Sequence, residues 1–267
     1  MNHTFSLLVL GVLLVSVSAV NKYAVLVAGS AGYSNYRHQA DICHAYHVLI
    51  NGGLDPNNII VMMKDDIANN SENPYPGQIF NHPDGQDVYA GVRIDYRGNE
   101  VTPENFLAVL QGDSAATGGK RVLTSTAEDD VFINFSDHGA TGLIAFPSKY
   151  LYAKDLNNAI KNMHAKGMYK NLLFYLEACE SGSMFNNYLP KDINVYAITA
   201  ANPTQSSWAT YCYPHDTVNG KHINSCLGDE FSVNWMEDSD AEMIAMATDT
   251  YQVGSQYDKV KSETTES

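Results

Sequence analysis

The sequence predicts an α/β fold with a mostly parallel central sheet. Two apolar runs, residues 131–135 and 172–176, have the length and the β-branched or aromatic composition of strands that are covered on both faces. The segment between them is long enough for a crossover helix, so the two strands can be neighbours in one sheet. Strands and helices also alternate along the rest of the chain, which favours the same doubly covered sheet.

The N-terminal part of the expected fold is a strand–helix–strand unit. The apolar run 23–29 has the composition of a strand, and a helical pattern follows over 38–49. We expect that helix to end at 51–53, because Asn-Gly-Gly is a strong C-terminal signal. The apolar run 58–63 is the next expected strand, so this unit contributes two strands to the sheet.

A long polar excursion separates this unit from the two central strands. Residues 65–99 contain several prolines and glycines, and the length of the segment suggests a functional or capping loop. A helix is expected over 102–110, because Thr102 suits the N-cap and Pro103 suits the first helical position. The remaining expected elements are a short strand over 142–146, a helix over 154–165, a strand over 194–199, helices over 228–236 and 241–252, and a polar C-terminal tail over 253–267.

The composition is that of an acidic globular protein with a real core. The chain has 267 residues, of which 45% are hydrophobic and 17% charged, and its net charge is −14. This charge weighs against nucleic-acid binding, which needs a basic surface. Residues 5–17 are apolar but too few to span a bilayer, and small residues follow, so 1–19 is predicted to be a signal peptide. We therefore expect a soluble protein of the secretory pathway, lysosomal, vacuolar or secreted, without nucleic-acid or membrane partners.

Chemically useful residues directly follow both central runs. His138 and Gly139 follow the first run, and Cys179 follows the second. Parallel strands end at the same edge of a sheet, so the imidazole and the thiol are expected side by side there. A thiolate attacks a carbonyl while an imidazole takes the proton and later gives it to the leaving amine. Either residue alone would more often be structural, but the shared strand–turn context predicts catalysis, with the amides of Gly139 and Cys179 as an oxyanion hole.

The other cysteines have simpler explanations. Cys43 lies in an apolar helical pattern and is expected to be buried and inert. Cys212 and Cys226 bracket a polar, glycine-containing loop, and a secreted protein would normally join such a pair in a disulfide. Cys179 is then the thiol with a reason to stay free.

Four motifs closely resemble the legumain, or asparaginyl endopeptidase, family of cysteine peptidases. They are NYRHQAD at 35–41, DHG at 137–139, EACESG at 177–182 and NWMEDS at 234–239. The likeness runs from about Lys22 to the C-terminus. It implies a caspase-like α/β/α sandwich, with a catalytic domain over 22–252, that cleaves proteins and peptides after Asn, and after Asp at acid pH.

The resemblance also assigns roles to single residues. It implies Cys179 as the nucleophile, His138 as its partner and Asn35 as the residue that orients the imidazole. The Cys212 and Cys226 pair resembles the loop disulfide of the plant members, and inhibitors of the cystatin type are possible partners by the same resemblance. The specificity pocket that it implies is formed by Arg37, His38, Glu177, Ser206 and Asp229.

The chemistry of this residue set matches an amide side chain. An Asn side chain offers one carbonyl acceptor and an NH₂ donor. Arg37 supplies a donor for the first, and Glu177 and Asp229 supply acceptors for the second. A protonated Asp resembles Asn, whereas an ionised Asp would meet like charges, so cleavage after Asp is expected only in acid.

The chain departs from the family in one respect. Legumains are made as longer precursors in which a C-terminal helical region covers the active site. This sequence stops soon after the predicted catalytic domain. The expectation is a chain without the C-terminal prodomain, as a fragment, a processed form or a variant.

Three other functions remain as alternatives. A peptide ligase would use the same acyl-enzyme and let an amine capture it. The catalytic subunit of the GPI transamidase shares the Arg-His, His-Gly and Cys signatures, but the Glu177 and Ser206 positions and the lack of a C-terminal anchor weigh against it. A secreted calcium-binding protein could use the acidic clusters at 129–130 and 237–240, but their spacing does not follow the twelve-residue calcium loop.

The sequence predicts no cofactor and no metal site, and it contains a candidate glycosylation site. Asn69 begins an Asn-Asn-Ser sequon in the polar excursion. Asn134 also begins a sequon, but it lies in an expected buried strand, where modification is not expected.

Overall fold

A six-stranded, fully parallel sheet forms the centre of the protein. The computed structural model describes residues 21–245 and 253–264, so the predicted signal peptide lies outside the described residues. The strand order is β3-β2-β1-β4-β8-β9. These strands are β1 Lys22–Ala28, β2 Ile59–Met63, β3 Tyr96–Arg97, β4 Asp130–Ser136, β8 Asn171–Glu177 and β9 Val195–Thr199. The predicted α/β class and the mostly parallel sheet are confirmed.

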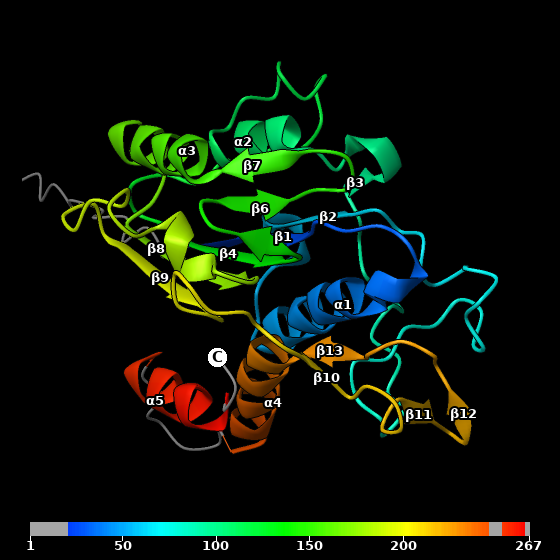
Figure 1. Ribbon diagram of the computed structural model, residues 1–267. Helices are drawn as coiled ribbons and strands as arrows, with labels where there is room; N and C mark the ends of the chain where they lie inside the picture. The colour runs from blue at the N-terminus through cyan, green and yellow to red at the C-terminus, as the bar shows by residue number, and fades with distance from the viewer. Residues whose placement is uncertain (1–20, 246–252, 265–267) are drawn as a thin grey trace, which may run out of the picture.

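Helices cover both faces of this sheet (Figure 1). Helices α1 (Tyr36–Asn51) and α4 (Glu230–Ala245) lie on one face, and α2 (Pro103–Leu110) and α3 (Ala153–Ala165) lie on the other. Because both faces are covered, the central strands send alternate side chains into two separate apolar cores. The first turn of α2 has the predicted cap, with the Thr102 side chain accepting a hydrogen bond from the Asn105 N–H.

Short strands outside the main sheet surround its C-terminal edge. Strands β5 (Gly139–Ala140), β6 (Leu143–Ala145) and β7 (Tyr150–Tyr152) form an antiparallel sheet, in which β6 is the predicted short strand. Two further antiparallel pairs are β10 (Ala209–Thr210) with β13 (Gly228–Asp229) and β11 (Thr217–Val218) with β12 (Lys221–His222). Four 3₁₀ turns complete the described elements: Tyr33–Asn35, Pro56–Asn58, Gly98–Glu100 and Ser181–Met184.

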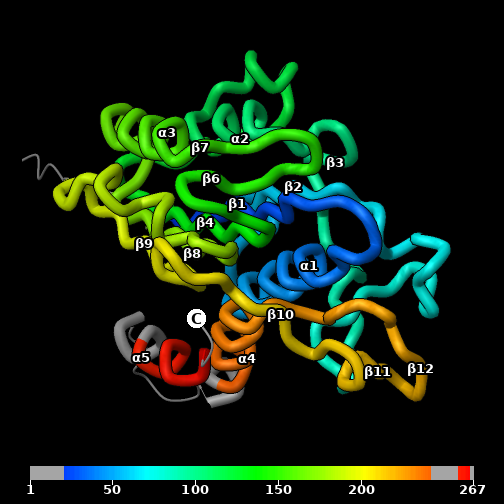
Figure 2. The backbone as a smooth tube through the Cα atoms, in the orientation of Figure 1, coloured from blue at the N-terminus to red at the C-terminus, as the bar shows by residue number. Residues whose placement is uncertain are grey.

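The long excursion after β2 packs against the β11–β12 hairpin (Figure 2). Tyr75 donates a hydrogen bond to the Val218 carbonyl at 2.5 Å, and the Lys221 ammonium lies over the Tyr75 ring. The excursion also contributes β3, a two-residue edge strand that is too short to have a periodic sequence signal. The predicted loop is therefore an ordered segment that packs against the hairpin and ends in an edge strand of the sheet.

The C-terminal region differs from the prediction in two ways. The helices expected over 228–236 and 241–252 are one helix, α4, up to residue 245, because no glycine or proline interrupts the acidic stretch between them; residues 246–252 lie outside the described residues. The expected polar tail contains helix α5 (Val253–Glu263). Val260 is buried in the core, and Lys259 pairs with the buried Asp238 of α4, so these two contacts hold α5 in place.

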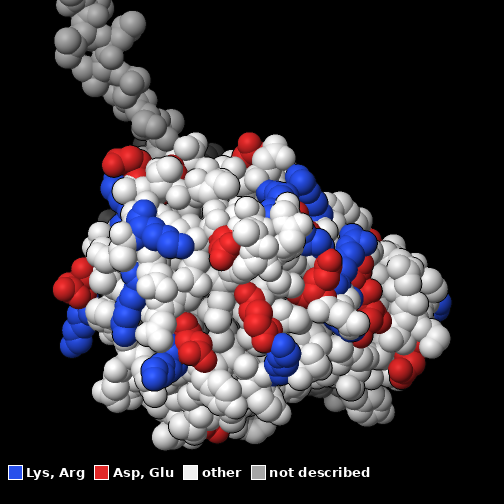
Figure 3. Space-filling model, turned by 90° about the horizontal axis from the view of Figure 1, so that it is seen from above, with Lys and Arg blue, Asp and Glu red and all other residues white. Residues whose placement is uncertain are grey.

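Charged side chains of both signs lie on the surface. The face seen in Figure 3 carries basic and acidic side chains intermixed, without a continuous basic patch. Within the described ranges, none of the helices combines the length and the apolar character needed to cross a bilayer.

Candidate active site

The register of β4 and β8 brings the two predicted catalytic segments to one edge of the sheet. Ser136, the last residue of β4, pairs with Glu177, the last residue of β8. The Asp137 N–H then donates to the Glu177 carbonyl at 3.1 Å, which ties the two chains together just beyond the sheet. His138 and Cys179 follow directly on these neighbouring chains, as the sequence predicts.

A sharp turn after β8 leaves the Cys179 thiol at the surface of the edge. Glu180 adopts a left-handed conformation with φ 53°, so the strand direction ends abruptly and the turn Ser181–Met184 follows. The Glu180 N–H donates to the Gln205 carbonyl at 2.7 Å, which holds this turn against the segment after β9. The thiol is partly buried and faces Ser207, whose hydroxyl and carbonyl lie 3.9 and 3.8 Å from its sulfur.

Asn35 fixes the orientation and the tautomer of His138. The Asn35 Nδ2 donates to the Ala31 carbonyl at 2.9 Å, which turns its Oδ1 toward the imidazole. That Oδ1 lies 2.8 Å from His138 Nε2, so the network assigns the proton to Nε2 and leaves Nδ1 as the basic nitrogen. Partial desolvation and the charge of Arg37 lower the pKa of His138, which increases the neutral fraction of this base in mild acid.

Gly139 packs directly against the backbone of the nucleophile. A Cβ at this position would lie 2.5 Å from the Cys179 carbonyl oxygen and 3.0 Å from the Ala178 Cβ. No side chain fits without displacing one of the two chains. This close approach places Gly139 beside the backbone of Cys179, and the role of its amide in an oxyanion hole stays a prediction.

Gly139→Ala is expected to lower kcat/KM by about 10²-fold or more, because the backbone shift separates groups that must be aligned to within about 1 Å. Steady-state kinetics measures the effect, and circular dichroism shows whether the fold is kept. Ala140→Ser is the matched control, since Ala140 is exposed in the same short strand. Equal activity of Gly139→Ala and wild type would contradict the predicted role of this contact.

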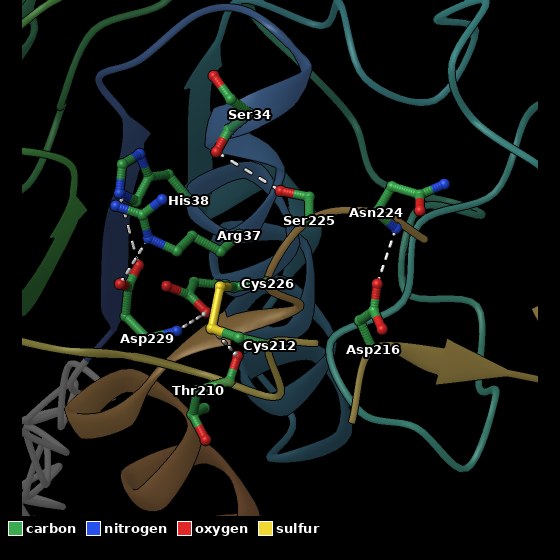
Figure 4. Close-up of a disulfide and its surroundings, with 11 residues drawn as sticks. Ser34, Arg37, His38, Thr210, Cys212, Asp216, Asn224, Ser225, Cys226 and Asp229 are labelled. Carbon is green, nitrogen blue, oxygen red and sulfur yellow. Dashed lines mark hydrogen bonds and ion pairs between the residues drawn. A yellow bond between two sulfur atoms is a disulfide. The ribbon is translucent and has the colours of Figure 1, made fainter. Parts of the chain in front are cut away.

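The predicted specificity residues form a buried charged cluster next to this edge. Arg37 Nε donates to Asp229 Oδ1 at 2.8 Å, and His38 Nε2 lies 3.6 Å from Asp229 Oδ2. Figure 4 shows both side chains, from consecutive positions of α1, converging on Asp229 beside the disulfide. Glu177 Oε2 accepts hydrogen bonds from the N–H and the hydroxyl of Ser232 at 2.8 and 2.9 Å. Four of the five predicted pocket residues are thus brought together.

Several buried acceptor atoms in this cluster have no hydrogen-bond partner among the described residues. They are Glu177 Oε1, Asp229 Oδ2 and both carboxyl oxygens of Asp137. Burial and the charge of Asp229 raise the pKa of Glu177 to about 8. Burial also raises the pKa of Asp137 to about 8. Unpaired buried acceptors are costly, so the cluster is suited to a ligand that brings its own donors.

Sequence reasoning missed three residues of the site. Ser207 contacts the thiol, next to Ser206, which is exposed and whose predicted place in the pocket stays a prediction. Asp41 and Asp137 are also buried in the cluster. Asp41 could have been found, because it lies one helical turn after Arg37 and therefore on the same face of α1.

The histidines of the cluster are engaged in hydrogen bonds. One ligand atom each of His38, Asp137 and His138 lies within 4.8 Å of the others, a set that could approach a metal ion. However, Ser30 Oγ lies 2.7 Å from His38 Nδ1, and Asn35 holds His138. Each of the two imidazoles therefore already has a hydrogen-bond partner at one ring nitrogen.

The predicted disulfide is confirmed and lies beside the pocket. Cys212 and Cys226 are bonded, with Cα atoms 4.1 Å apart. They close the segment between β10 and β13, and β13 carries Asp229. Among the described residues the free cysteines are Cys43, which is buried, and Cys179, as predicted.

Comparisons with known proteins agree with the motifs. A model of the peptidase C13 family matches residues 22–267. Legumain of Mus musculus is 55% identical over 91% of this chain and 54% of its own length. A vacuolar-processing enzyme of Glycine max is 50% identical over 91% of this chain and 49% of its own length. A hemoglobinase of Schistosoma japonicum is 52% identical over 91% of this chain and 55% of its own length.

The chain spans about half the length of these curated relatives. Among solved structures, caspase-1 of Spodoptera frugiperda aligns over 83% of this chain and 69% of its own, with a TM-score of 0.46 and 10% identity. The family match covers both the edge that carries His138 and Cys179 and the pocket beside it. The predicted resemblance is confirmed, and the chain belongs to the peptidase C13 family.

Proposed function

We propose that this protein is a cysteine endopeptidase that hydrolyses peptide bonds after asparagine, and after aspartate in acid. The observation that carries the proposal is the pairing of Ser136 with Glu177, which delivers His138 and Cys179 to one edge beside the charged pocket. The names of the relatives, legumain and vacuolar-processing enzyme, support the same class of activity.

The residues at the edge can perform both halves of the reaction. His138 Nδ1 takes the thiol proton of Cys179, and the thiolate attacks the substrate carbonyl carbon. The N–H groups of Gly139 and Cys179 stabilise the oxyanion. The imidazolium then protonates the leaving amine, which gives an acyl-enzyme. Water attacks this thioester with His138 as the base, and the thiolate leaves with the released acid.

The pocket can read an asparagine side chain through three groups. Arg37 binds Asp229 through Nε, so its Nη groups can donate to the amide oxygen of the substrate. Asp229 Oδ2, which has no partner, can accept from the substrate NH₂. Glu177 is held through Oε2, and in its protonated form it can donate from Oε1 to the same amide oxygen. An ionised aspartate would meet the Asp229 carboxylate and be repelled.

The ratio of cleavage after Asn to cleavage after Asp is expected to fall as the pH falls toward about 4, the pKa of a free Asp side chain. Protonation gives the substrate Asp an O–H that can donate to Asp229, as the Asn NH₂ does. Peptides that differ only in Asn, Asp, Gln or Ala at the cleavage position, assayed from about pH 4 to 7, measure this ratio. The ratio cancels pH effects on the dyad, which both substrates share. A constant ratio, or equal cleavage after Ala, would contradict the proposed pocket.

Other expectations from the sequence remain proposals. We propose glycosylation at Asn69, which is exposed in a loop. We also propose a lysosomal, vacuolar or secreted location, which agrees with the names of the relatives. The catalytic domain is proposed to cover 22–252, with protein and peptide substrates and cystatin-type inhibitors as partners.

A further inference from the structure

The excursion after β2 reaches the elements of the specificity pocket through two consecutive residues, Phe80 and Asn81. Both are 2% exposed, so this part of the excursion belongs to the interior. The Phe80 N–H donates to the Tyr36 hydroxyl at 2.6 Å. Tyr36 is the first residue of α1 and the neighbour of Arg37. The excursion therefore contacts the helix that supplies one half of the pocket ion pair.

Asn81 joins that helix to the strand that supplies the other half. Its Nδ2 donates to Asp41 Oδ1 of α1 at 2.9 Å and to the Leu227 carbonyl at 2.9 Å. Leu227 directly precedes β13, whose second residue is Asp229. The two protons of one amide thus bridge α1 and β13, and the ion pair of Arg37 with Asp229 spans the same two elements (Figure 4).

The orientation of the Asn81 amide is fixed by its surroundings. Reversing the amide would place Oδ1 opposite a carboxyl oxygen and a backbone carbonyl, and a carbonyl oxygen cannot donate a hydrogen bond. In the observed orientation Oδ1 lies 2.7 Å from Nδ1 of His44, which also belongs to α1. Both donors and one acceptor position of the amide are therefore used, as a buried polar group requires.

Asn81 packs closely against the pocket strand. A Cβ on Gly228, the residue before Asp229, would lie 2.8 Å from Asn81 Nδ2 and 2.4 Å from the Val233 side chain of α4. The start of β13 is therefore held between the amide on one side and α4 on the other. A densely packed interior transmits such a displacement instead of absorbing it, so a shift of Asn81 moves Asp229.

The part of the excursion that carries Asn81 is held by its own hydrogen bonds. The Ile79 N–H donates to Asp87 Oδ1 at 3.1 Å, and the Val88 N–H donates to the Ile79 carbonyl at 2.8 Å. Phe80 and Asp87 also form an antiparallel bridge. This closed loop gives the Asn81 amide a firm support against which β13 can be held.

We propose that Asn81 is a positioning residue that sets the place of Asp229 in the specificity pocket. Its amide holds β13 against α1, so that Asp229 meets Arg37 and keeps its second oxygen available to the side-chain NH₂ of the substrate. This role rests on the proposed function and deepens it, because it makes the excursion part of the apparatus that selects asparagine. Asn81 acts through Asp229 and not on the substrate itself.

Asn81→Ala and Asn73→Ala separate this role from a merely structural one. Asn73 is 4% exposed in the same excursion, and its Nδ2 also donates to backbone carbonyls, those of Ile67, Ala68 and Gln78. These acceptors all belong to the excursion, so the loss of Asn73 should lower stability without breaking a contact to β13. Each variant removes a buried amide, but only Asn81→Ala breaks the bridge to the pocket strand.

For an Asn peptide near pH 5, Asn81→Ala is expected to lose about 30-fold or more in kcat/KM, mainly through KM, because the acceptor for the substrate amide is displaced. Alkylation of Cys179 by N-ethylmaleimide should keep its rate to within about twofold, because this reagent does not use the pocket. Asn73→Ala should stay within about threefold of the wild type in both measurements.

Three kinetic outcomes would overturn the proposal. The first is an Asn81→Ala protein with the wild-type KM for the Asn peptide. The second is an equal rise of KM in Asn81→Ala and Asn73→Ala, which would show that any buried amide of the excursion has the same effect. The third is an Asn81→Ala protein that does not fold, as judged by circular dichroism, because Asn81 would then support the whole fold and not the pocket.

Amide hydrogen exchange tests the bridge without an activity assay. In Asn81→Ala the segment 226–230, which contains β13, should exchange about tenfold faster or more than in the wild type, whereas in Asn73→Ala it should exchange at the wild-type rate. Equal protection of this segment in Asn81→Ala and the wild type would overturn the proposal. If the wild type does not cleave after Asn, the proposed function fails, and the exchange rates still decide whether Asn81 holds β13.

Discussion

Cys179→Ala is expected to reduce kcat/KM for an Asn peptide by about 10⁵-fold or more, because it removes the atom that forms the acyl-enzyme. The fold should be kept, since the thiol is only partly buried and makes only long contacts, with Ser207. Steady-state kinetics measures the loss. Mass spectrometry after treatment with a thiol-alkylating probe should show one modified residue in the wild type, Cys179.

Cys43→Ala is the matched control, because Cys43 is the other free cysteine of the described residues. Its sulfur is buried 3.9 Å from the Met63 sulfur, and burial raises the pKa of its thiol well above the usual value. It should therefore resist the probe, and its replacement should leave catalysis intact at a stability cost of about 1 kcal/mol. Full activity of Cys179→Ala, or labelling of Cys43 in the native protein, would contradict the assigned nucleophile.

The second large effect is a loss of stability as the pH rises from about 6.5 to about 8. Burial raises the pKa of Glu177 and of Asp137 to about 8 in the folded protein, against ordinary values of 4.5 and 3.8. The folded state therefore binds protons that the unfolded state has already lost, so the free energy of unfolding falls as the pH rises. Between pH 6.5 and 8, each carboxyl group that keeps its proton lowers the free energy of unfolding by about 2 kcal/mol. This is a large part of the stability of a typical domain.

Histidines and surface acids act in other pH ranges. Burial lowers the pKa of His38 and of His138, so the free energy of unfolding that they contribute rises with pH up to the ordinary histidine value of 6.5 and is constant above it. Pairing with Lys120 lowers the pKa of Glu100, and pairing with Lys149 lowers that of Glu104. Both glutamates are therefore already ionised in weak acid, and their contribution to the free energy of unfolding does not change above that pH. Above pH 6.5, a change in the free energy of unfolding with pH is therefore attributed to the buried carboxyl groups.

Urea unfolding of the inactive Cys179→Ala protein between pH 5 and 8 measures this effect without self-digestion. The transition midpoint should decrease above pH 6.5, with a slope that Glu177→Gln makes shallower, because Gln cannot ionise. Glu104→Gln is the control, since Glu104 is exposed and its pairing with Lys149 does not titrate in this range. A midpoint that rises with pH would show that these carboxyl groups are ionised in the folded protein.

The sequence predicted the parts of the protein that have a periodic or local signal. The runs 131–135 and 172–176 became the central strands β4 and β8, and their polar ends met as expected. The strand β3 has two residues, and α5 depends on contacts with α4, so neither leaves a clear pattern in the sequence. Both elements depend on contacts with distant segments of the chain.

In the candidate site, too, features with a local sequence signal were predictable and features that depend on distant contacts were not. The elements that carry Asn35, His138 and Cys179 were predictable, because motifs and strand ends mark them. The burial of Asp41 and Asp137 was not predictable from composition, since acidic residues are rarely fully buried. Their burial depends on partners that arrive from distant segments, such as Asn81 for Asp41.

The pairing of Ser136 with Glu177 has a consequence for changing what the enzyme cuts. Glu177 of the proposed pocket is the last residue of β8, and Cys179, the proposed nucleophile, follows it by two residues, so recognition and bond breaking would depend on the same short segment. A redesign at Glu177 therefore disturbs the nucleophile as well as the pocket. Asp229 lies on β13, a short ribbon outside the main sheet that is paired with β10 and braced by the disulfide. Retargeting the enzyme to a new side chain should begin there, where selectivity can change while the reacting atoms keep their alignment.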